Sequence, residues 1–301
     1  MERRQLLKAA IGSAAGIVLG APFLRAQGTA ETVKLADDLF IVKIPGEANV
    51  VVQTGTDGVL LVDGGSAAGS DALLKAIAAL PNGSGKIHTL FNTHWHPEQT
   101  GSNERLGMAG TTIIAHENTR LWLQQNVTWP WNNKTVKKLP KIAQPNKTFY
   151  DNGKLDSGIR YGWVADAAHT DGDLYVYFPK QNVLAVGDAA YGQGWPVVDW
   201  WSGGWIGGIV GGLQRLQTVA DKDTKIIPAR GPALSLDDLR TQVDMYGRLY
   251  DTLSQMMNRG RGPTEAVEVK PAKEFEAKMG NSDEFIRRSF ESLWAYLSPD
   301  A

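Results

Sequence analysis

The stretch THWHPEQTG at residues 93–101 follows an apolar run, Ile87 to Phe91, which predicts a buried strand. Because side chains alternate along an extended chain, His94 and His96 should point the same way at the end of that strand. Such a pair can offer two imidazole nitrogens to one metal ion, and a catalytic zinc takes about three protein ligands. The chain has 5 histidines in total, so this pair directs the search to a third ligand.

Strand and helix patterns on both sides of this stretch predict a mixed sheet covered by helices. The apolar alternation between Val33 and Asp63, broken by an Asp57-Gly58 turn, is typical of β-hairpins. Residues 68–80 then show helical periodicity. After the histidine pair we expect a helix at 102–108, a strand at 111–115 and a helix at 117–125.

A second series of elements repeats the order of strands followed by helices. We expect strands at 147–150, 159–165, 174–178, 183–186 and 225–227, and helices at 203–219, 236–257 and 282–297. Two such halves, packed sheet against sheet with helices outside, predict an α/β fold of the four-layer αββα sandwich type. Residues 27–301 would form this sandwich as one domain.

The segment between the two halves, residues 126–145, shows no strong periodicity. It holds Trp129-Pro130-Trp131 beside several lysines. We interpret it as a surface loop or flap, because long irregular connections are often functional; the alternative is an excursion without a role.

A third imidazole is available in AHTDGD at residues 168–173, between two predicted strands. Another candidate is Asp188, which ends an apolar strand, because burying a carboxylate there is costly unless a cation or hydrogen-bond donors receive it. Loops at strand ends can converge on one rim of a sandwich. We therefore expect His169 and Asp188 to join His94 and His96 around a metal.

Composition and the first residues narrow the class of protein. The absence of cysteine excludes disulfides and thiolate metal ligands, and a formal net charge of −1 gives no reason to expect a nucleic-acid partner.

Residues 1–26 combine a twin arginine, Arg3-Arg4, with a short apolar run broken by glycines and a proline. Twin-arginine signals are recognised by a receptor and direct the export of proteins that are already folded. We predict an exported, periplasmic protein without stable membrane insertion once the signal is removed; the alternative is an uncleaved anchor.

The order of four motifs resembles the metallo-β-lactamase superfamily of hydrolases. These are THxH with the later TG, AHTDGD, VGD at 186–188 and IIPARGP at 226–232, with VDG at 62–64 similar to a turn of that family. The resemblance runs from about Leu35 to Pro232. Within the superfamily, the chain is similar in particular to exported single-domain members of the quinoprotein-relay and SoxH-like type.

The resemblance implies a first metal site formed by His94, His96 and His169, with Asp188 as a bridging carboxylate. It also implies that the second metal site is lost. Glu98 and Gln99 stand where that site has an aspartate and a histidine, and Arg230 stands where it has its last histidine. Glutamine is a poor zinc ligand, and a guanidinium does not deprotonate to ligate. We therefore expect one zinc ion rather than two.

Arg230 has a physical rationale at this position, because it restores a positive charge beside the carboxylates of Glu98 and Asp188. It would act either as a salt-bridge residue or as a stabiliser of the transition state. Glu98 or Asp188 would accept the proton of a zinc-activated water. Asp63 is interpreted as bracing a turn, and His88 and His116 as structural, the latter in a helix cap region.

Four aromatic residues follow Asp188 among glycines and are candidates for a substrate wall: Tyr191, Trp195, Trp200 and Trp201. Aromatic faces suit a flat apolar small-molecule substrate, while the alternative is packing of the helix that follows. The sequence thus predicts a mono-zinc hydrolase acting on an ester, thioester, lactone or amide-type bond. The alternative is a non-catalytic periplasmic protein that uses the same pocket to bind a metal or small molecule.

Overall fold

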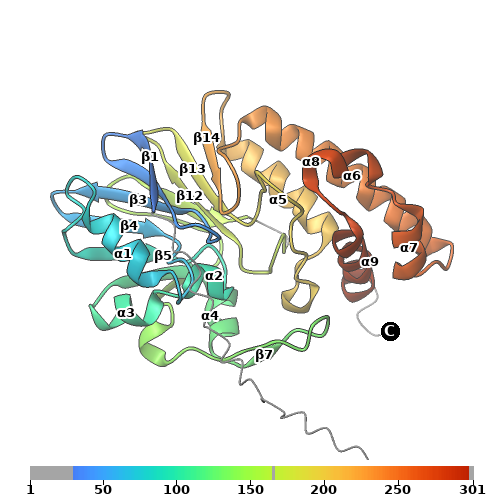
Figure 1. Ribbon diagram of the computed structural model, residues 1–301, viewed down its shortest axis with the longest axis horizontal. Coiled ribbons are helices and arrows are strands. Elements are labelled where there is room, and N and C mark those ends of the chain that lie inside the picture. The colour runs from blue at the N-terminus through green and yellow to red at the C-terminus, as the bar shows by residue number, and fades with distance from the viewer. Residues whose placement is uncertain (1–29, 165–166, 298–301) are drawn as a thin grey trace, which may run out of the picture.

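Two β-sheets form the centre of the fold in the computed structural model, which describes residues 30–164 and 167–297 (Figure 1). The predicted export signal at 1–26 lies outside the described residues. The first sheet has the order β1-β2-β3-β4-β5-β6-β9 and the second β10-β11-β12-β13-β14. The strands of the first are β1 (Glu31–Ala36), β2 (Leu39–Lys43), β3 (Val50–Gly55), β4 (Gly58–Val62), β5 (Ile87–Phe91), β6 (Thr112–His116) and β9 (Lys147–Phe149). Those of the second are β10 (Asn152–Lys154), β11 (Arg160–Trp163), β12 (Leu174–Phe178), β13 (Val183–Gly187) and β14 (Lys225–Pro228).

Strand β2 shows how one strand serves two layers. Leu39 and Ile41 point to the second sheet and pack in a core that also contains Val176 of β12. Phe40 and Val42 point the other way, into a separate core beneath the first helices. Because side chains alternate in extended chain, an unbroken apolar strand of this kind must be covered on both faces.

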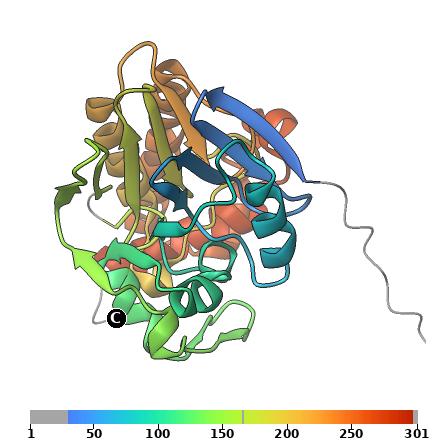
Figure 2. The same ribbon diagram turned by 90° about the vertical axis from the view of Figure 1, so that its left-hand side faces the viewer.

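Helices cover the outer face of each sheet. The first sheet carries α1 (Ser70–Ala78), α2 (Pro97–Thr100), α3 (Asn103–Met108) and α4 (Glu117–Leu123). The second carries α5 (Ile206–Val219), α6 (Leu236–Asn258), α7 (Pro263–Val269), α8 (Glu276–Met279) and α9 (Asp283–Leu297). Figures 1 and 2 show the teal to green helices on the side of the blue strands and the orange to red helices on the opposite side. The predicted four-layer αββα sandwich is confirmed.

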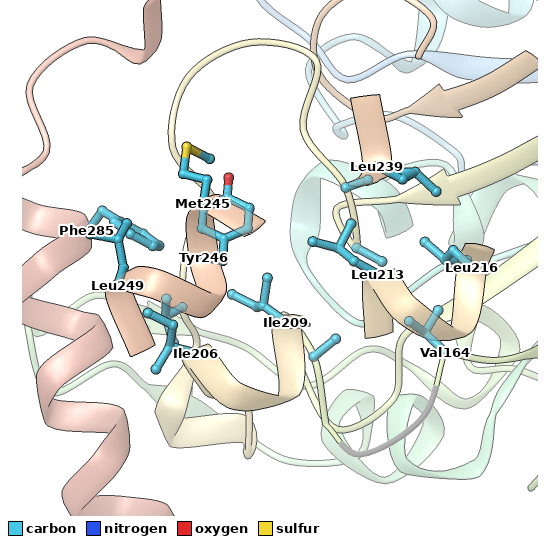
Figure 3. Close-up of a cluster of buried hydrophobic side chains, with 14 of the residues drawn as sticks. Val164, Ile206, Ile209, Leu213, Leu216, Leu239, Met245, Tyr246, Leu249 and Phe285 are labelled. Atoms are coloured by element: carbon cyan, nitrogen blue, oxygen red, sulfur yellow. The ribbon is translucent and has the colours of Figure 1, made fainter. Parts of the chain in front are cut away.

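The largest outer core lies where α5, α6 and α9 meet. Figure 3 shows Ile209 and Leu213 of α5 facing Leu239 and Leu249 of α6, with Phe285 of α9 beside them. These side chains are at most 3% exposed, so this half of the sandwich is closed by helix packing as well as by the sheet. Burying apolar surface of this kind is the main stabilising contribution to the fold.

Several sequence predictions of individual elements need correction. The strand at 147–150 pairs with β6 and so belongs to the first sheet rather than the second. The helix expected from residue 203 begins at Ile206, because Gly203 has a left-handed φ of 85° that ends a preceding short turn of 3-10 helix, Trp200–Ser202. Strand β10 and helices α7 and α8 were not predicted, since each is short and carries little periodicity.

Residues 126–145 form a small hairpin and a helical turn rather than an irregular excursion. Strands β7 (Val127–Thr128) and β8 (Thr135–Val136) pair antiparallel, and a 3-10 turn follows at Lys141–Ala143. Trp129 in the hairpin is only 7% exposed, so the segment is anchored to the body of the protein. No helix in the described part of the chain has the length and apolar character needed to cross a membrane.

Truncating the α5–α6 core should destabilise the protein measurably. Leu213→Ala removes a fully buried side chain, so we expect a loss of about 2–5 kcal/mol in the free energy of unfolding. Leu121→Ala in α4 is a matched control, because Leu121 is 46% exposed and its truncation should cost less than about 1 kcal/mol. Urea unfolding followed by circular dichroism measures both; equal effects would contradict the assigned core.

Candidate metal centre

Three histidines from two separate parts of the chain meet at one rim of the sandwich. His94 and His96 follow β5, and His169 lies in the loop between β11 and β12. The ring centroids are 4.7 Å apart for His94–His96, 4.7 Å for His94–His169 and 4.8 Å for His96–His169. All three are buried, and their potential ligand atoms lie within 4.8 Å of one another. The predicted convergence of the three imidazoles is therefore present.

In two of these histidines the Nδ1 atom is occupied by a neighbour, which leaves Nε2 for a ligand. His94 Nδ1 lies 3.1 Å from Thr93 Oγ1, and its buried Nε2 has no hydrogen-bond partner among the described residues. His169 Nδ1 donates to the backbone carbonyl of Val197, which can only accept. The tautomer with a proton on Nδ1 therefore gives His169 an unprotonated Nε2.

His96 has the opposite arrangement. Its Nε2 lies 2.8 Å from Asp199 Oδ2, and burial alone would raise the pKa of that carboxyl. Hydrogen bonds from His96 and Ser202, together with the neighbouring imidazoles, outweigh burial and place the pKa of Asp199 below its ordinary value. An ionised Asp199 only accepts, so His96 Nε2 donates, and in the neutral ring that metal binding requires His96 Nδ1 carries a lone pair.

Two lone pairs consequently face each other, because His169 Nε2 and His96 Nδ1 are 3.1 Å apart. Without a proton between them this approach is repulsive, whereas a cation between them makes it favourable. Two nitrogens at about 2.0–2.1 Å from a tetrahedral zinc would be separated by roughly 3.3 Å. The donor set and its spacing therefore fit a metal ion held by His94 Nε2, His96 Nδ1 and His169 Nε2.

The electrostatics of His94 favour the neutral form that metal binding requires. Burial lowers the pKa of His94 well below its usual value, and the nearby His96, His169 and Arg230 lower it further. A neutral imidazole needs no deprotonation before it ligates a metal.

The strand end that carries the pair is fixed from beneath by Asp63, as expected of a bracing residue. Asp63 ends β4 with a φ of 68° and accepts hydrogen bonds from the backbone N–H of Thr93, at 2.8 Å, and from its hydroxyl. Burial raises the pKa of Asp63 to about 8, although the bonds from Thr93 oppose this. Thr93 thus links Asp63 to the ring of His94.

Asp188 reaches the histidines because β13 ends in a glycine. Gly187 has a φ of 56°, and a Cβ atom there would come within 2.4 Å of Thr93 Oγ1. This close approach brings Asp188 Oδ2 to 3.6 Å from His94 Nε2 and 3.9 Å from His169 Nε2. The other oxygen, Asp188 Oδ1, is buried without a partner among the described residues. Asp188 therefore borders the place where the three imidazoles point.

Arg230 enters the site from the end of β14, and its backbone is fixed on both sides. Asn49 Nδ2 donates to the carbonyls of Pro228 at 2.8 Å and Gly231 at 3.0 Å, and Gly192 N donates to Arg230 O at 2.9 Å. Although burial would lower the pKa of Arg230, the neighbouring Asp188, Tyr191 and Glu98 raise it above its ordinary value. The guanidinium is thus close to both carboxylates, as the charge argument predicted.

Gln99, which stands where the family has a histidine of the second metal site, is fully buried. Its Nε2 donates to Asp188 Oδ2 over 3.4 Å, while its Oε1 has no partner among the described residues. Glu98 in the first turn of α2 lines the adjoining cleft. Neither residue adds a further nitrogen ligand, and within the described chain the metal-binding group consists of the three histidines.

The cleft in front of the histidines has a cavity volume of about 210 Å³. Of the predicted substrate wall, Tyr191 lines it, whereas three tryptophans pack elsewhere. Trp195 stacks on Phe285, with ring centroids 4.8 Å apart. Trp200 donates its indole N–H to Glu291, and Trp201 is 48% exposed to solvent. The packing alternative describes Trp195 and Trp200, which contact residues of α9, whereas Trp201 is largely exposed.

The aromatic wall comes instead from the β7–β8 hairpin. Trp129 and Trp131 line the cleft, and the Trp129 ring lies 5.5 Å from that of His96 in an edge arrangement. Trp129 Nε1 also donates to Asp199 Oδ2 over 3.4 Å. Residues 126–145, expected as a surface loop or flap, thus supply part of the cleft wall.

Asp199 is the functional candidate that the sequence interpretation missed. It is fully buried in a segment rich in tryptophan, where a carboxylate requires strong donors. The cost of burying this carboxylate is the sequence signal that could have identified Asp199. The two other histidines are structural as expected: His88 contacts Thr89, and the His116 ring accepts from the backbone N–H of Asn118 as the cap of α4.

Comparison with known proteins agrees with this geometry. The sequence profile of the metallo-beta-lactamase superfamily matches residues 44–241. The fold is similar to a metallo-beta-lactamase from Pontibacter korlensis, with a TM-score of 0.58 and 20% identity over 72% of this chain and 99% of that one. It is also similar to the DIM-1 metallo-beta-lactamase (0.58, 16%, over 73% and 98%) and to TMB-1 (0.56, 15%, over 73% and 98%). No curated protein sequence matches the chain.

Asp199→Asn should weaken metal binding without unfolding the protein. The amide can no longer hold His96 in the required tautomer as an ionised acceptor, so we expect the Kd for Zn²⁺ to rise about 10–100-fold. Competition against a chromophoric chelator measures it. Asp223→Asn is the control, since Asp223 pairs with Lys222 at the surface and its change should leave the Kd unaltered. Equal zinc affinity in both variants would contradict the assigned role of Asp199.

Proposed function

This chain belongs to the metallo-beta-lactamase superfamily, and we propose that it is a hydrolase dependent on one zinc ion held by His94, His96 and His169. The observation that carries the proposal is the 3.1 Å approach of His169 Nε2 and His96 Nδ1, the ring nitrogens turned away from Val197 and Asp199, at the foot of an open cleft. An all-imidazole set with one carboxylate at its edge suits zinc. The bond hydrolysed would be of the ester, thioester, lactone or amide type.

Zinc in this position would lower the pKa of a water molecule towards about 7 and polarise a carbonyl group. Asp188 is the residue best placed to receive the proton of the attacking water. Its Oδ2 lies within 3.9 Å of the ligand nitrogens of both His94 and His169, whereas Glu98 lines the cleft without such a contact. Gln99 donates to that same oxygen and thereby fixes its direction.

Arg230 and Glu98 would act on the substrate. Arg230 lines the cleft beside Tyr191, and its guanidinium offers donors for an oxyanion that develops as a carbonyl is attacked. Its charge also compensates the buried carboxylate of Asp188 where a second metal would otherwise be needed. We therefore assign Arg230 to orienting the substrate and Glu98 to the polar wall of the cleft.

Removing one imidazole tests zinc binding and turnover together. We expect the purified protein to hold about one zinc ion per chain and to hydrolyse at least one member of a panel of activated esters, thioesters, lactones and β-lactams. His169→Ala should reduce turnover more than about 100-fold, because losing even a supporting residue of a ligand costs about 10–100-fold. Elemental analysis and the same substrate panel measure both quantities.

The control for this variant is His88→Ala, which removes a partly buried histidine from the far end of β5. It should retain zinc and turnover. Zinc binding at full stoichiometry without turnover of any substrate class would overturn the hydrolase and favour the non-catalytic binding protein. Turnover that survives in His169→Ala and in chelator-treated protein would overturn the metal.

Restoring two histidines tests the role of Arg230. The double substitution Gln99→His and Arg230→His replaces the guanidinium and the amide beside Asp188 with metal ligands, so zinc should rise from about one to about two ions per chain. Arg230→His alone should stay near one. Unchanged turnover in the double variant would show that Arg230 is dispensable, whereas a fall in kcat at constant zinc content in Arg230→Gln would support its assigned role.

A further inference from the structure

The mouth of the cleft is built by two elements far apart in the chain. The tip of the β7–β8 hairpin contributes Trp131 and Lys134, and α9 contributes Arg288. The guanidinium carbon of Arg288 lies 4.4 Å from the centroid of the Trp131 ring, which joins the two elements. Lys134 Nζ lies 5.7 Å from the centroid of the Trp129 ring, which in turn stacks on Trp131. Two cations thus sit on one pair of stacked indoles.

The cations at the mouth retain donors for a ligand. Arg288 uses Nε to donate to Glu284 at 2.7 Å, and its Nη groups have no hydrogen-bond acceptor among the described residues. No ion pair of Lys134 occurs in the described part of the chain, and its contact there is with the face of Trp129. A guanidinium has five N–H donors, so one exposed carboxylate leaves most of them available.

Two of the three cationic side chains that line the cleft lie at its mouth. Lys134, Arg230 and Arg288 line it against the carboxylates of Glu98 and Asp188. Cationic side chains gathered at the mouth of a cleft attract ligands of the opposite charge.

We propose that the substrate carries an oxyanionic group, such as a carboxylate or sulfonate, remote from the bond that is hydrolysed. Lys134 and Arg288 hold this group at the mouth, while Trp129 and Trp131 bound the intervening apolar part. Arg230 stays at the foot of the cleft with the histidines. The inference rests on the proposed hydrolase function, because it treats the bound molecule as a substrate. The cationic side chains at the mouth do not depend on the metal.

Binding of a slowly hydrolysed probe tests the anion site separately from catalysis. The probe is the monoanilide of glutaric acid, and the neutral comparison is its primary amide, titrated calorimetrically into metal-free and zinc-loaded protein. We expect the anion to bind at least about 10-fold more tightly than the amide in both forms, since charge-assisted hydrogen bonds exceed neutral ones. The sulfonate analogue should bind similarly, because the donors recognise oxyanions generally.

Two variants with matched controls locate the site. Lys134→Met and Arg288→Gln should each raise the Kd of the anilide about 5–10-fold and leave that of the neutral amide unchanged. Lys137→Met on the same hairpin and Arg287→Gln on the same helix remove a charge outside the cleft and should have little effect. Thermal unfolding shows whether each variant is folded.

Salt dependence in the unaltered protein gives a second measurement that needs no variant. Raising sodium chloride should weaken the anilide and spare the amide, because ions screen partly exposed charges. Equal affinity for the charged and neutral probes, or equal effects of Lys134→Met and Lys137→Met, would overturn the proposal. Charge-selective binding to metal-free protein with no turnover of any substrate would overturn the hydrolase while retaining the anion site.

Discussion

The close approach of His169 Nε2 to His96 Nδ1 depends on two acceptors in the segment that precedes α5. Val197 and Asp199 each accept from the outer nitrogen of one ring, so neither imidazole can turn its proton inward. The low pKa of Asp199 keeps that acceptor ionised. Because the rings are buried, water does not separate the two lone pairs freely, and a cation is the natural partner for them. The site is thus preorganised for metal by hydrogen bonds one step away from it.

The same rim of the sandwich must also hold two opposite charges at low cost. Asp188 has one oxygen without a partner and the other shared with Gln99, which is a weak set of donors for a buried carboxylate. Arg230 raises the local positive charge without occupying a ligand position, because its backbone is held at the end of β14 by Asn49. A guanidinium does not deprotonate in proteins, so Arg230 keeps its positive charge beside Asp188 at every working pH.

The sequence predicted the layers and the three imidazoles because their signals are local. Apolar runs such as Ile87–Phe91 define strands by themselves, and alternation at the end of β5 pairs His94 with His96. His169 lies between antiparallel strands of the other sheet, so its assignment to the site rested on the order of the family motifs. It did not predict that β9 joins the first sheet, since its three residues carry no register information. The role of Asp199 was also missed, because its partner His96 is 103 positions away. The tryptophans from 195 to 201 read equally well as wall or packing until their neighbours were known.

The foot and the mouth of the cleft differ in whether their residues belong to the segment that matches the superfamily profile. The superfamily profile covers residues 44–241, which include the three histidines, Asp188 and Arg230. Arg288 lies beyond that range, yet it packs on Trp131 of the hairpin and lines the same cleft. A candidate metal site within the matched segment is therefore bordered by a cleft whose lining includes a C-terminal helix outside that segment. Under the proposed function, selection of the substrate could change there without disturbing the metal ligands, because Arg288 packs on Trp131 of the hairpin rather than on a ligand histidine.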